Sequence, residues 1–233
     1  PTPPGHWRWV GTKTLIFEPD GRFPMATDYT VEVPAGTRSA KGGTLNEAER
    51  WTFSTPPPAI VTSLPVKGPS VRDPLFFVAF DQKIDPRAVL NTIAVRAGTV
   101  SAAARLASDE EVKSDRDVRR LAGDAGEGRW LAVKVGQLLP ADAEVTGAVR
   151  DGAPSAEGPR KTAQAQSWRF RTYGLLRVTS RECGYRGECR PGTPWVIGFS
   201  NPIDARTFDK GMVQVAPELP GLKVSAHGAA ISI

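Results

Sequence analysis

The chain repeats itself, and this repeat limits the folds that it can adopt. Residues 51–63 read Trp-Thr-Phe-Ser-Thr-Pro-Pro-Pro-Ala-Ile-Val-Thr-Ser, and residues 168–180 read Trp-Arg-Phe-Arg-Thr-Tyr-Gly-Leu-Leu-Arg-Val-Thr-Ser. Each copy has an aromatic-x-aromatic-x-Thr pattern, a short spacer and a second β-prone run that ends in Val-Thr-Ser. We interpret each copy as the last strand of one domain, a hinge, and the first strand of the next domain.

Two further pairs of segments align at nearly the same distance along the chain. Residues 24–33 align with residues 140–149, an offset of 116, and residues 77–86 align with residues 196–205, an offset of 119. Because similar segments recur in one order, the pattern is typical of tandem structural units.

The repeat divides the chain into one complete unit and two incomplete ones. Residues 59–172 are the complete unit, residues 1–56 are the C-terminal half of a preceding unit, and residues 174–233 are the N-terminal part of a following unit. A half unit exposes an apolar face and unpaired strand edges. We therefore expect the half units to be completed by residues outside this sequence or by another copy of the chain.

Short alternating segments predict an all-β fold. Tyr29, Val31 and Val33 alternate with polar residues, which places them on one face of a strand. Residues 75–80 are apolar on both faces, as is typical of a central strand, and residues 212–215 continue the strand pattern. Glycine and proline together supply frequent turns, since the chain has 23 and 21 of them. The sequence predicts tandem Ig-like antiparallel β-sandwich domains.

Residues 108–123 are the one candidate for a helix. Ser108 and Glu111 have the spacing of a capping box, and Gly123 would end the helix. A charged surface excursion explains the segment equally well, because apolar residues such as Val118 fit helical spacing only in part.

The aromatic residues and the prolines predict how consecutive units join. All six tryptophans fall in strand patterns, which favours packing in cores over stacking on sugars. Trp51 and Phe53 should be buried in the first sandwich, and Ile60 and Val61 in the second. Three prolines at 56–58 form a stiff connector. The second joint, Tyr173-Gly174, lacks prolines and should be looser unless Tyr173 packs across it.

The two cysteines, Cys183 and Cys189, are separated by five residues. They are too few for a structural zinc site and do not form a C-x-x-C redox motif. The spacing predicts a disulfide that closes a short loop, and hence an oxidising compartment such as the periplasm or the cell exterior. Two reduced thiols in a glycine-rich loop are the alternative.

Motifs that carry chemistry are absent from the sequence. His6 and His227 have no nucleophile beside them, and no G-x-S-x-G or phosphate-binding glycine motif occurs. Asp81 and Asp85 are too few to bind calcium, and Asp85 before a proline indicates a helix cap instead. The net charge of +5 is scattered, without the motifs of nucleic-acid-binding folds. The sequence predicts no catalytic, cofactor-binding or metal-binding residue, no cofactor and no nucleic-acid partner.

Several short segments of the sequence resemble known bacterial modules. The aromatic-x-Thr strand end at residues 51–55, and the F-x-x-x-I-D segments at Phe80 to Asp85 and Phe199 to Asp204, resemble bacterial Ig-like modules. The sequences of residues 11–19 and 128–132 look most like those of the N-terminal domains of bacterial α-2-macroglobulin-family proteins.

That resemblance implies a secreted or lipid-anchored periplasmic endopeptidase inhibitor, which traps target proteases after they cleave a bait segment. Contact with a membrane would then run only through a lipid anchor outside this segment. Many such proteins carry a Cys-x-Glu-Gln thioester, but Cys183 and Cys189 are followed by other residues and cannot form it. No functional residue is therefore carried over from the family.

Three functions remain open from the sequence. The first is a non-catalytic Ig-like scaffold segment of a protease-trapping macroglobulin, in contact with neighbouring domains of the same chain. The second is a cell-surface or S-layer-type Ig-like array that acts in adhesion or as a spacer. The third is an accessory module of a secreted polysaccharide-active enzyme, which requires exposed aromatic side chains.

Overall fold

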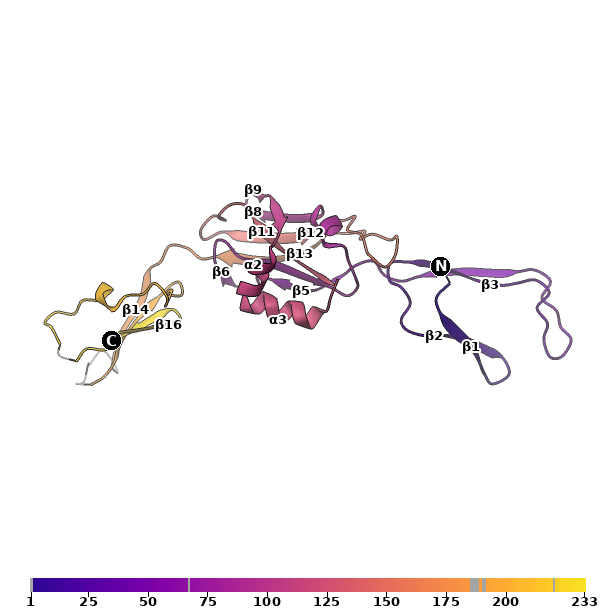
Figure 1. Ribbon diagram of the computed structural model, residues 1–233, viewed down its shortest axis with the longest axis horizontal. Helices are drawn as coiled ribbons and strands as arrows, with labels where there is room; N and C mark the ends of the chain where they lie inside the picture. Colours follow the sequence, from indigo (N-terminus) through magenta and orange to yellow (C-terminus); the bar gives the residue numbers. More distant parts are fainter. Residues whose placement is uncertain (1, 67, 185–188, 190–191, 220) are drawn as a thin grey trace.

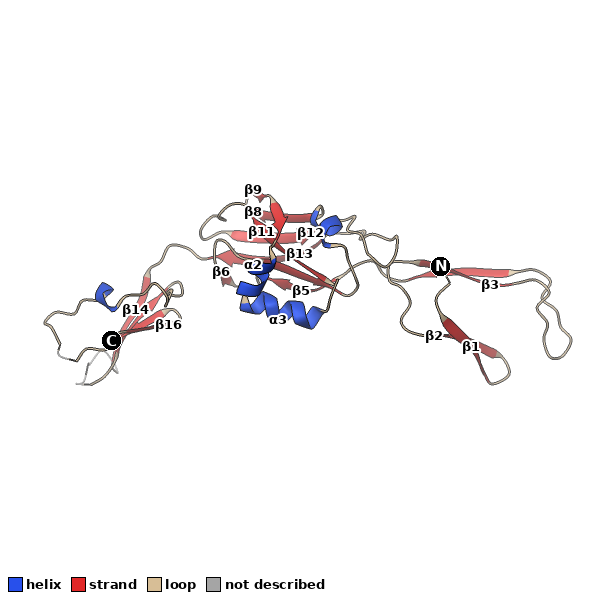
Figure 2. Cartoon of the chain, in the orientation of Figure 1, coloured by secondary structure: helices blue, strands red, loops and turns tan. Residues whose placement is uncertain are grey.

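The computed structural model describes residues 2–66, 68–184, 189, 192–219 and 221–233, and it is built mainly of β-strands (Figure 1). The strands form three groups in a row along an elongated chain (Figure 1). Helices occur in the central group, with one further short turn near the C-terminus (Figure 2). No helix among the described residues is long and apolar enough to cross a membrane. The fold class is all-β, as the sequence predicts.

The N-terminal strands form two separate hairpins, each a two-stranded antiparallel sheet. They are β1 (Gly5–Val10) with β2 (Thr14–Pro19), and β3 (Asp28–Val33) with β4 (Glu49–Ser54). The prediction that Trp51 and Phe53 are buried is wrong, since they are 51% and 39% exposed. Phe53 packs against Phe23 and Tyr29, with ring centroids 5.6 and 5.1 Å apart, but among the described residues no second sheet covers it.

The central strands form a complete two-sheet sandwich. One sheet has the order β10-β11-β7-β5 and the other has the order β6-β13-β12-β8-β9. The first sheet contains β10 (Ala104–Leu106), β11 (Trp130–Val135), β7 (Phe76–Phe80) and β5 (Ile60–Leu64). The second contains β6 (Pro69–Ser70), β13 (Gln166–Thr172), β12 (Glu144–Val149), β8 (Ile93–Ala97) and β9 (Val100–Ala102).

The strand β7 is buried on both faces, as the unbroken apolar run predicts. Phe76, Val78 and Phe80 point into the core between the two sheets, where they pack with residues of β11, β12 and β13. Phe77 and Ala79 point the other way, into a second cluster that α3 (Arg116–Ala125) completes through Val118. The apolar run therefore reflects a strand covered by a sheet on one side and by a helix on the other.

The helical candidate is confirmed as two helices, α2 (Asp109–Ser114) and α3. Both hydrogen bonds of the capping box between Ser108 and Glu111 are present. The predicted stop at Gly123 is wrong, because α3 runs to Ala125. The apolar residues fit one helical period poorly because Asp115 ends α2 and caps α3. The cap predicted at Asp85 is also present, at the start of α1 (Pro86–Leu90).

The C-terminal strands form one four-stranded sheet in the order β14-β15-β17-β16. These are β14 (Val178–Cys183), β15 (Trp195–Phe199), β17 (Ala230–Ser232) and β16 (Ser225–His227), with the 3-10 helix η1 (Lys210–Met212) between β15 and β16. The strand predicted at residues 212–215 does not form. In the central sandwich its counterpart β8 pairs with β12, and the described residues of the C-terminal sheet include no strand equivalent to β12.

Strand register confirms the internal repeat. Tyr29 pairs with Phe53 across β3 and β4, and their counterparts Val145 and Phe170 pair in the same way across β12 and β13. The hairpin of β5 with β7 likewise matches that of β14 with β15, and both contain an irregularity at the same place.

That irregularity changes the alignment of the two Val-Thr-Ser runs and the expected burial of Val61. Ile60 pairs with Phe80 as Val178 pairs with Phe199, so the two Val-Thr-Ser runs are one residue out of structural register. The bulge after Ile60 also explains why Val61 is 60% exposed, although the sequence predicts that it is buried. Ile60 itself packs against the central core.

The prediction that the tryptophans pack in cores holds for two of the six. Trp130 stacks on Phe77, with ring centroids 5.6 Å apart, and Trp168 packs against the central core. The remaining four belong to the N-terminal hairpins and the C-terminal sheet, where no second sheet formed by described residues covers them. Their exposed fractions are 59% for Trp7, 64% for Trp9, 51% for Trp51 and 37% for Trp195.

A repeated joint as the candidate functional site

The histidine and aspartate residues named above make the contacts of ordinary structural residues: hydrogen bonds, an ion pair and a helix cap. His6 lies 3.1 Å from the carboxylate of Glu18 in an exposed position, and His227 lies exposed on β16. Asp81 accepts a hydrogen bond from the backbone of Ala59, and Asp85 caps α1. In the part of the chain that the structure describes, no three metal-ligating side chains come together.

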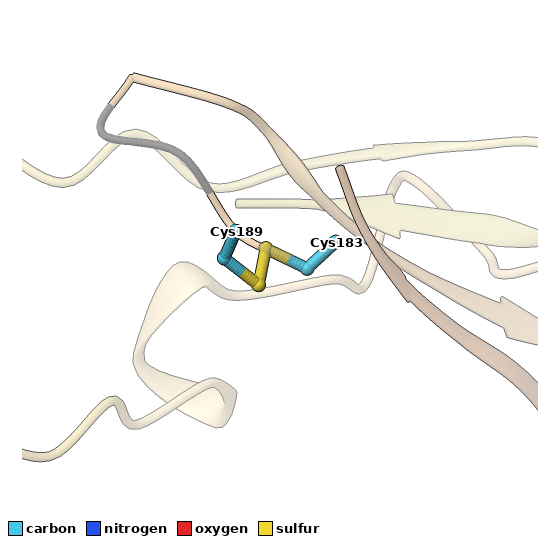
Figure 3. Close-up of a disulfide and its surroundings, with 2 residues drawn as sticks. All are labelled: Cys183 and Cys189. Atoms are coloured by element: carbon cyan, nitrogen blue, oxygen red, sulfur yellow. A yellow bond between two sulfur atoms is a disulfide. The ribbon is translucent and has the colours of Figure 1, made fainter. Parts of the chain in front are cut away.

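Cys183 and Cys189 are joined by a disulfide, as predicted, with their Cα atoms 5.1 Å apart (Figure 3). Cys183 is the last residue of β14 and pairs with Trp195 on β15. The bond therefore tethers the connection that leaves β14 to the edge of the C-terminal sheet. Most of the loop between the two cysteines, residues 185–188, lies outside the described residues.

The first of the two seams between strand groups is built around Thr55. Its hydroxyl donates to the carbonyl oxygen of Pro24 over 2.8 Å and accepts from the backbone N–H of Thr27 over 3.0 Å. Its own backbone N–H donates to the carbonyl oxygen of Thr27. These bonds tie the end of β4 to the loop that precedes β3.

The second seam repeats this arrangement around Thr172. Its hydroxyl donates to the carbonyl oxygen of Pro140 over 2.6 Å and accepts from the backbone N–H of Ala143 over 3.0 Å. Thr172 is 1% exposed. The final threonine of each aromatic-x-aromatic-x-Thr pattern thus fixes the end of its strand by hydrogen bonds, at the point where one group of strands ends and the next begins. We call this arrangement the threonine lock.

A pair of polar residues after β7 fixes the connector at the first seam. Asp81 and Ala59 exchange two hydrogen bonds, one from each backbone N–H, of 3.1 and 3.0 Å. Gln82 is fully buried, and its amide donates to the carbonyl oxygen of Pro56 over 3.3 Å. The proline connector is therefore held by the sandwich that follows it, in addition to its own stiffness.

Ser200 and Asn201 do the same after β15 at the second seam. Ser200 exchanges two hydrogen bonds with Arg177, of 2.9 and 3.0 Å. The amide of Asn201 donates to the carbonyl oxygen of Gly174 over 2.8 Å. The joint is thus a repeated structural element of this chain, with the same polar contacts at both seams.

The first seam carries an additional clamp, centred on Glu157. This residue lies on the loop between β12 and β13, and its side chain is 14% exposed. Its carboxylate accepts from the backbone N–H of Lys83 over 2.7 Å and from that of Met25 over 3.1 Å, and it pairs with Arg22. One side chain therefore joins the central sandwich to the loop before β3.

The ionised form of Glu157 is favoured in this position. Burial opposes ionisation, but the hydrogen bonds from the Lys83 and Met25 backbones and the charge of Arg22 outweigh it and lower the pKa of Glu157 below its ordinary value.

The residues next to Glu157 tighten the same contact. A Cβ atom on Gly158 would overlap the carbonyl oxygens of Met25 and Ala26 and the hydroxyl of Thr27, so glycine permits the close approach of the two loops. Arg160 donates its backbone N–H to the carbonyl oxygen of Ala26 over 2.8 Å. The repeat does not predict this clamp, since Gly158 matches Gly42 but Lys41 stands at the position of Glu157.

Near the second seam, an ion pair within the central sandwich lies at the surface. Arg171 donates to Asp142 over 2.9 Å, and this hydrogen bond lowers the pKa of Asp142. Both side chains are more than half exposed, so the pair adds little stability. Among the described residues, no loop reaches across this seam as residues 157–160 reach across the first.

Comparisons with known proteins agree with the fold. A family described as bacterial Ig-like domain matches residues 2–55. A curated relative, circularly permutated Ras protein 2 of Dictyostelium discoideum, is 22% identical over 158 residues, which cover 64% of this chain and 4% of that protein.

Solved structures of the bacterial S-layer protein SbsC are also similar. Its N-terminal part matches at 12% identity over 55% of this chain and 26% of that chain, with a TM-score of 0.30. Its domains 1–6 match at 9% identity over 96% of this chain and 32% of that chain, with a TM-score of 0.26. The chain spans a third or less of each of these proteins.

The family match supports an Ig-like domain, consistent with the antiparallel sheets of the fold. It concerns bacterial Ig-like domains in general, and none of the matches given above is to an α-2-macroglobulin-family protein.

Proposed function

We propose that this chain is a non-catalytic segment of a tandem Ig-like array, which holds neighbouring modules at a fixed spacing and orientation. The observation that carries the proposal is the clamp at the first seam. Glu157 of the central sandwich accepts hydrogen bonds from Lys83 and Met25, on both sides of the seam. A chain that only tethers its modules needs no buried carboxylate across the junction.

The proposed modules follow the repeat, with residues 1–56, 59–172 and 174–233 as successive units. The two seams then carry the same role, and the second should be the looser one, because its connector lacks the three prolines of the first. The first seam has the hydrogen bonds of Thr55, the contacts of Asp81 and Gln82 after β7, and the Glu157 clamp. Among the described residues, the second seam has the hydrogen bonds of Thr172 and the contacts of Ser200 and Asn201.

We place the array outside the cytoplasm, in the periplasm or at the cell surface. The disulfide between Cys183 and Cys189 supports this location, because such bonds persist in oxidising compartments. A protease trap of the macroglobulin family would use the chain in the same local way. The match to bacterial Ig-like domains gives that narrower function no support, so a surface spacer array is the function we propose.

Distances between spin labels test the proposal. Cysteines at the exposed positions Thr30 and Arg96 report on the first seam, and cysteines at Arg96 and Ser225 report on the second. The native disulfide does not react with thiol-specific labels. We expect one narrow distance distribution across the first seam and a broader one across the second. A distribution across the first seam as broad as that of a flexible linker would refute the proposal.

A further inference from the structure

A shallow hollow at the first seam gathers three cationic side chains around one carboxylate. It is lined by Arg22, Pro24, Lys83, Arg129 and Glu157, and its volume is about 370 Å³. Arg22 and Pro24 belong to the loop before β3, and the other three residues belong to the central sandwich. Both sides of the seam therefore contribute to one charged site.

The carboxylate of Glu157 cannot neutralise this cluster. One of its oxygens accepts from the guanidinium of Arg22 and from the backbone N–H of Lys83, and the other accepts from the backbone N–H of Met25. Its one negative charge stands against the three positive charges that line the hollow. The site therefore carries an excess of two positive charges.

Two of the three cations have no anionic partner. Among the residues that the structure describes, the side chains of Lys83 and Arg129 form no ion pair. Arg129 is also half-buried. A charge that is partly removed from water is costly unless it is paired, so an anion in the hollow would satisfy Arg129 in particular.

Hydrogen bonds of the backbone fix the positions of Lys83 and Arg129. The backbone N–H of Phe80 donates to the carbonyl oxygen of Arg129 over 2.7 Å. Lys83 donates its backbone N–H to Glu157, and its carbonyl oxygen accepts from the N–H of Ala156 over 2.9 Å. The two cations are therefore anchored before a ligand arrives, which lowers the cost of binding.

The corresponding position stays open in the central sandwich, where both sheets are present. At the offset of 116 residues, Leu138 stands at the position of Arg22. Leu138 is 63% exposed, although its own sandwich has two sheets. A second sheet beside the N-terminal hairpins would therefore leave Arg22 accessible as well.

We infer that this hollow binds a tetrahedral oxyanion with two negative charges, either free phosphate or sulfate or the terminal phosphate of a monoester. Two negative charges balance the excess of the site. Arginine recognises such a group through paired N–H donors, and lysine adds a point charge. The hollow opens to solvent, so the organic part of an ester can extend outwards. This inference does not depend on the proposed spacer function.

Titration of the chain with sodium phosphate tests the site, at about pH 8, where phosphate is mainly a dianion. Amide shifts in two-dimensional NMR spectra report binding, and sodium chloride at equal ionic strength is the reference for screening. We expect phosphate and sulfate, but not chloride, to give saturable shifts around Lys83 and Arg129. Lys83→Ala and Arg129→Ala should each weaken phosphate binding about tenfold, because each removes a charge-assisted contact.

Arg96→Ala is the matched control, because Arg96 is an exposed residue of β8 outside the hollow and its loss changes the net charge equally. Arg129→Lys keeps the charge and should lose less affinity than Arg129→Ala. Lys83 is exposed, so Lys83→Ala tests the site even if an Arg129 variant does not fold. Shifts that rise without saturation, or an equal loss of affinity in Arg96→Ala, would overturn the inference.

Glycerol 3-phosphate distinguishes the two sources of the ligand. Binding as tight as that of inorganic phosphate would support a phosphate ester, whereas binding of inorganic phosphate and sulfate alone would support a free oxyanion. In both cases Lys83→Ala and Arg129→Ala must weaken the binding and Arg96→Ala must not. Binding of none of these anions to the wild type would overturn the inference.

Discussion

Thr172 donates its buried hydroxyl to the carbonyl oxygen of Pro140 over 2.6 Å. Replacing Thr172 with valine keeps the shape but leaves this carbonyl and the backbone N–H of Ala143 without that partner. We expect Thr172→Val to lower the free energy of unfolding of the central sandwich by about 1–3 kcal/mol, the cost of unsatisfied buried polar groups. Urea denaturation measures the loss. Thr172→Ser, which keeps the hydroxyl, should lose clearly less, and equal losses would contradict the role of the lock.

Acidification should loosen the first seam through Glu157. Its pKa in the folded protein is lowered from 4.5, so its ionised contacts stabilise the joint above about pH 4.5 and are lost as the pH falls through the lowered value. The label distance between positions 30 and 96 should therefore broaden in wild type at low pH. In Glu157→Gln it should already be broader at pH 7 and should change less with pH. Identical pH profiles in the two proteins would show that Glu157 does not control the joint.

Gly158→Ala should open the same seam without any change of charge. The new Cβ would overlap the loop at Met25, Ala26 and Thr27, so one of the two loops must move. We expect a shifted or broader label distance at pH 7. Gly136→Ala is the matched control, because a Cβ at Gly136 meets nothing within 4 Å. An unchanged distance in Gly158→Ala would mean that the loops do not approach as closely as the structure has them.

The sequence predicted the strands and the repeat because these depend on local pattern. Alternation at Tyr29, Val31 and Val33 and the unbroken apolar run of β7 each specify one strand and its faces. The capping box at Ser108 likewise specifies where a helix starts. Such signals need no knowledge of distant neighbours.

Burial at the two ends and the clamp could not be predicted in the same way. An aromatic-x-aromatic strand has the same sequence pattern whether or not a second sheet covers it. The pattern therefore predicts the same burial for Trp51 and its counterpart Trp168, although Trp51 is exposed and Trp168 packs against a core. Glu157 sits in a polar loop, where a carboxylate is ordinary. Only the fold brings it against Lys83 and Met25, which are distant in sequence.

Gly147 should be intolerant of any side chain. A Cβ there would overlap the indole ring of Trp168, the neighbouring residue on β13. We expect Gly147→Ala to cost about 1–3 kcal/mol, as overpacking of a well-packed core does. Trp168→Phe removes part of the crowded ring, and Trp168 Nε1 has no hydrogen-bond partner in the described structure that this change would forfeit.

A double-mutant cycle between Gly147→Ala and Trp168→Phe, measured by urea denaturation, checks this contact. The double variant should be more stable than the sum of the two single losses predicts. Strict additivity would show that the cost of Gly147→Ala arises elsewhere.

Loss of the disulfide should weaken the C-terminal sheet alone. The bond between Cys183 and Cys189 closes a short loop, and removing such a constraint costs about 2 kcal/mol in the chain-entropy description. In the Cys183→Ser/Cys189→Ser variant, amide protons of β14 and β15 should exchange faster by roughly 30-fold, the factor that corresponds to about 2 kcal/mol. Those of β7 and β11 should keep their wild-type rates, because among the described strands none of the central sandwich pairs with the C-terminal sheet. Reduced wild-type protein should behave like the variant. Faster exchange in β7 as well would show that the two groups of strands unfold together, and unchanged rates in β14 would show that the bond does not stabilise the sheet.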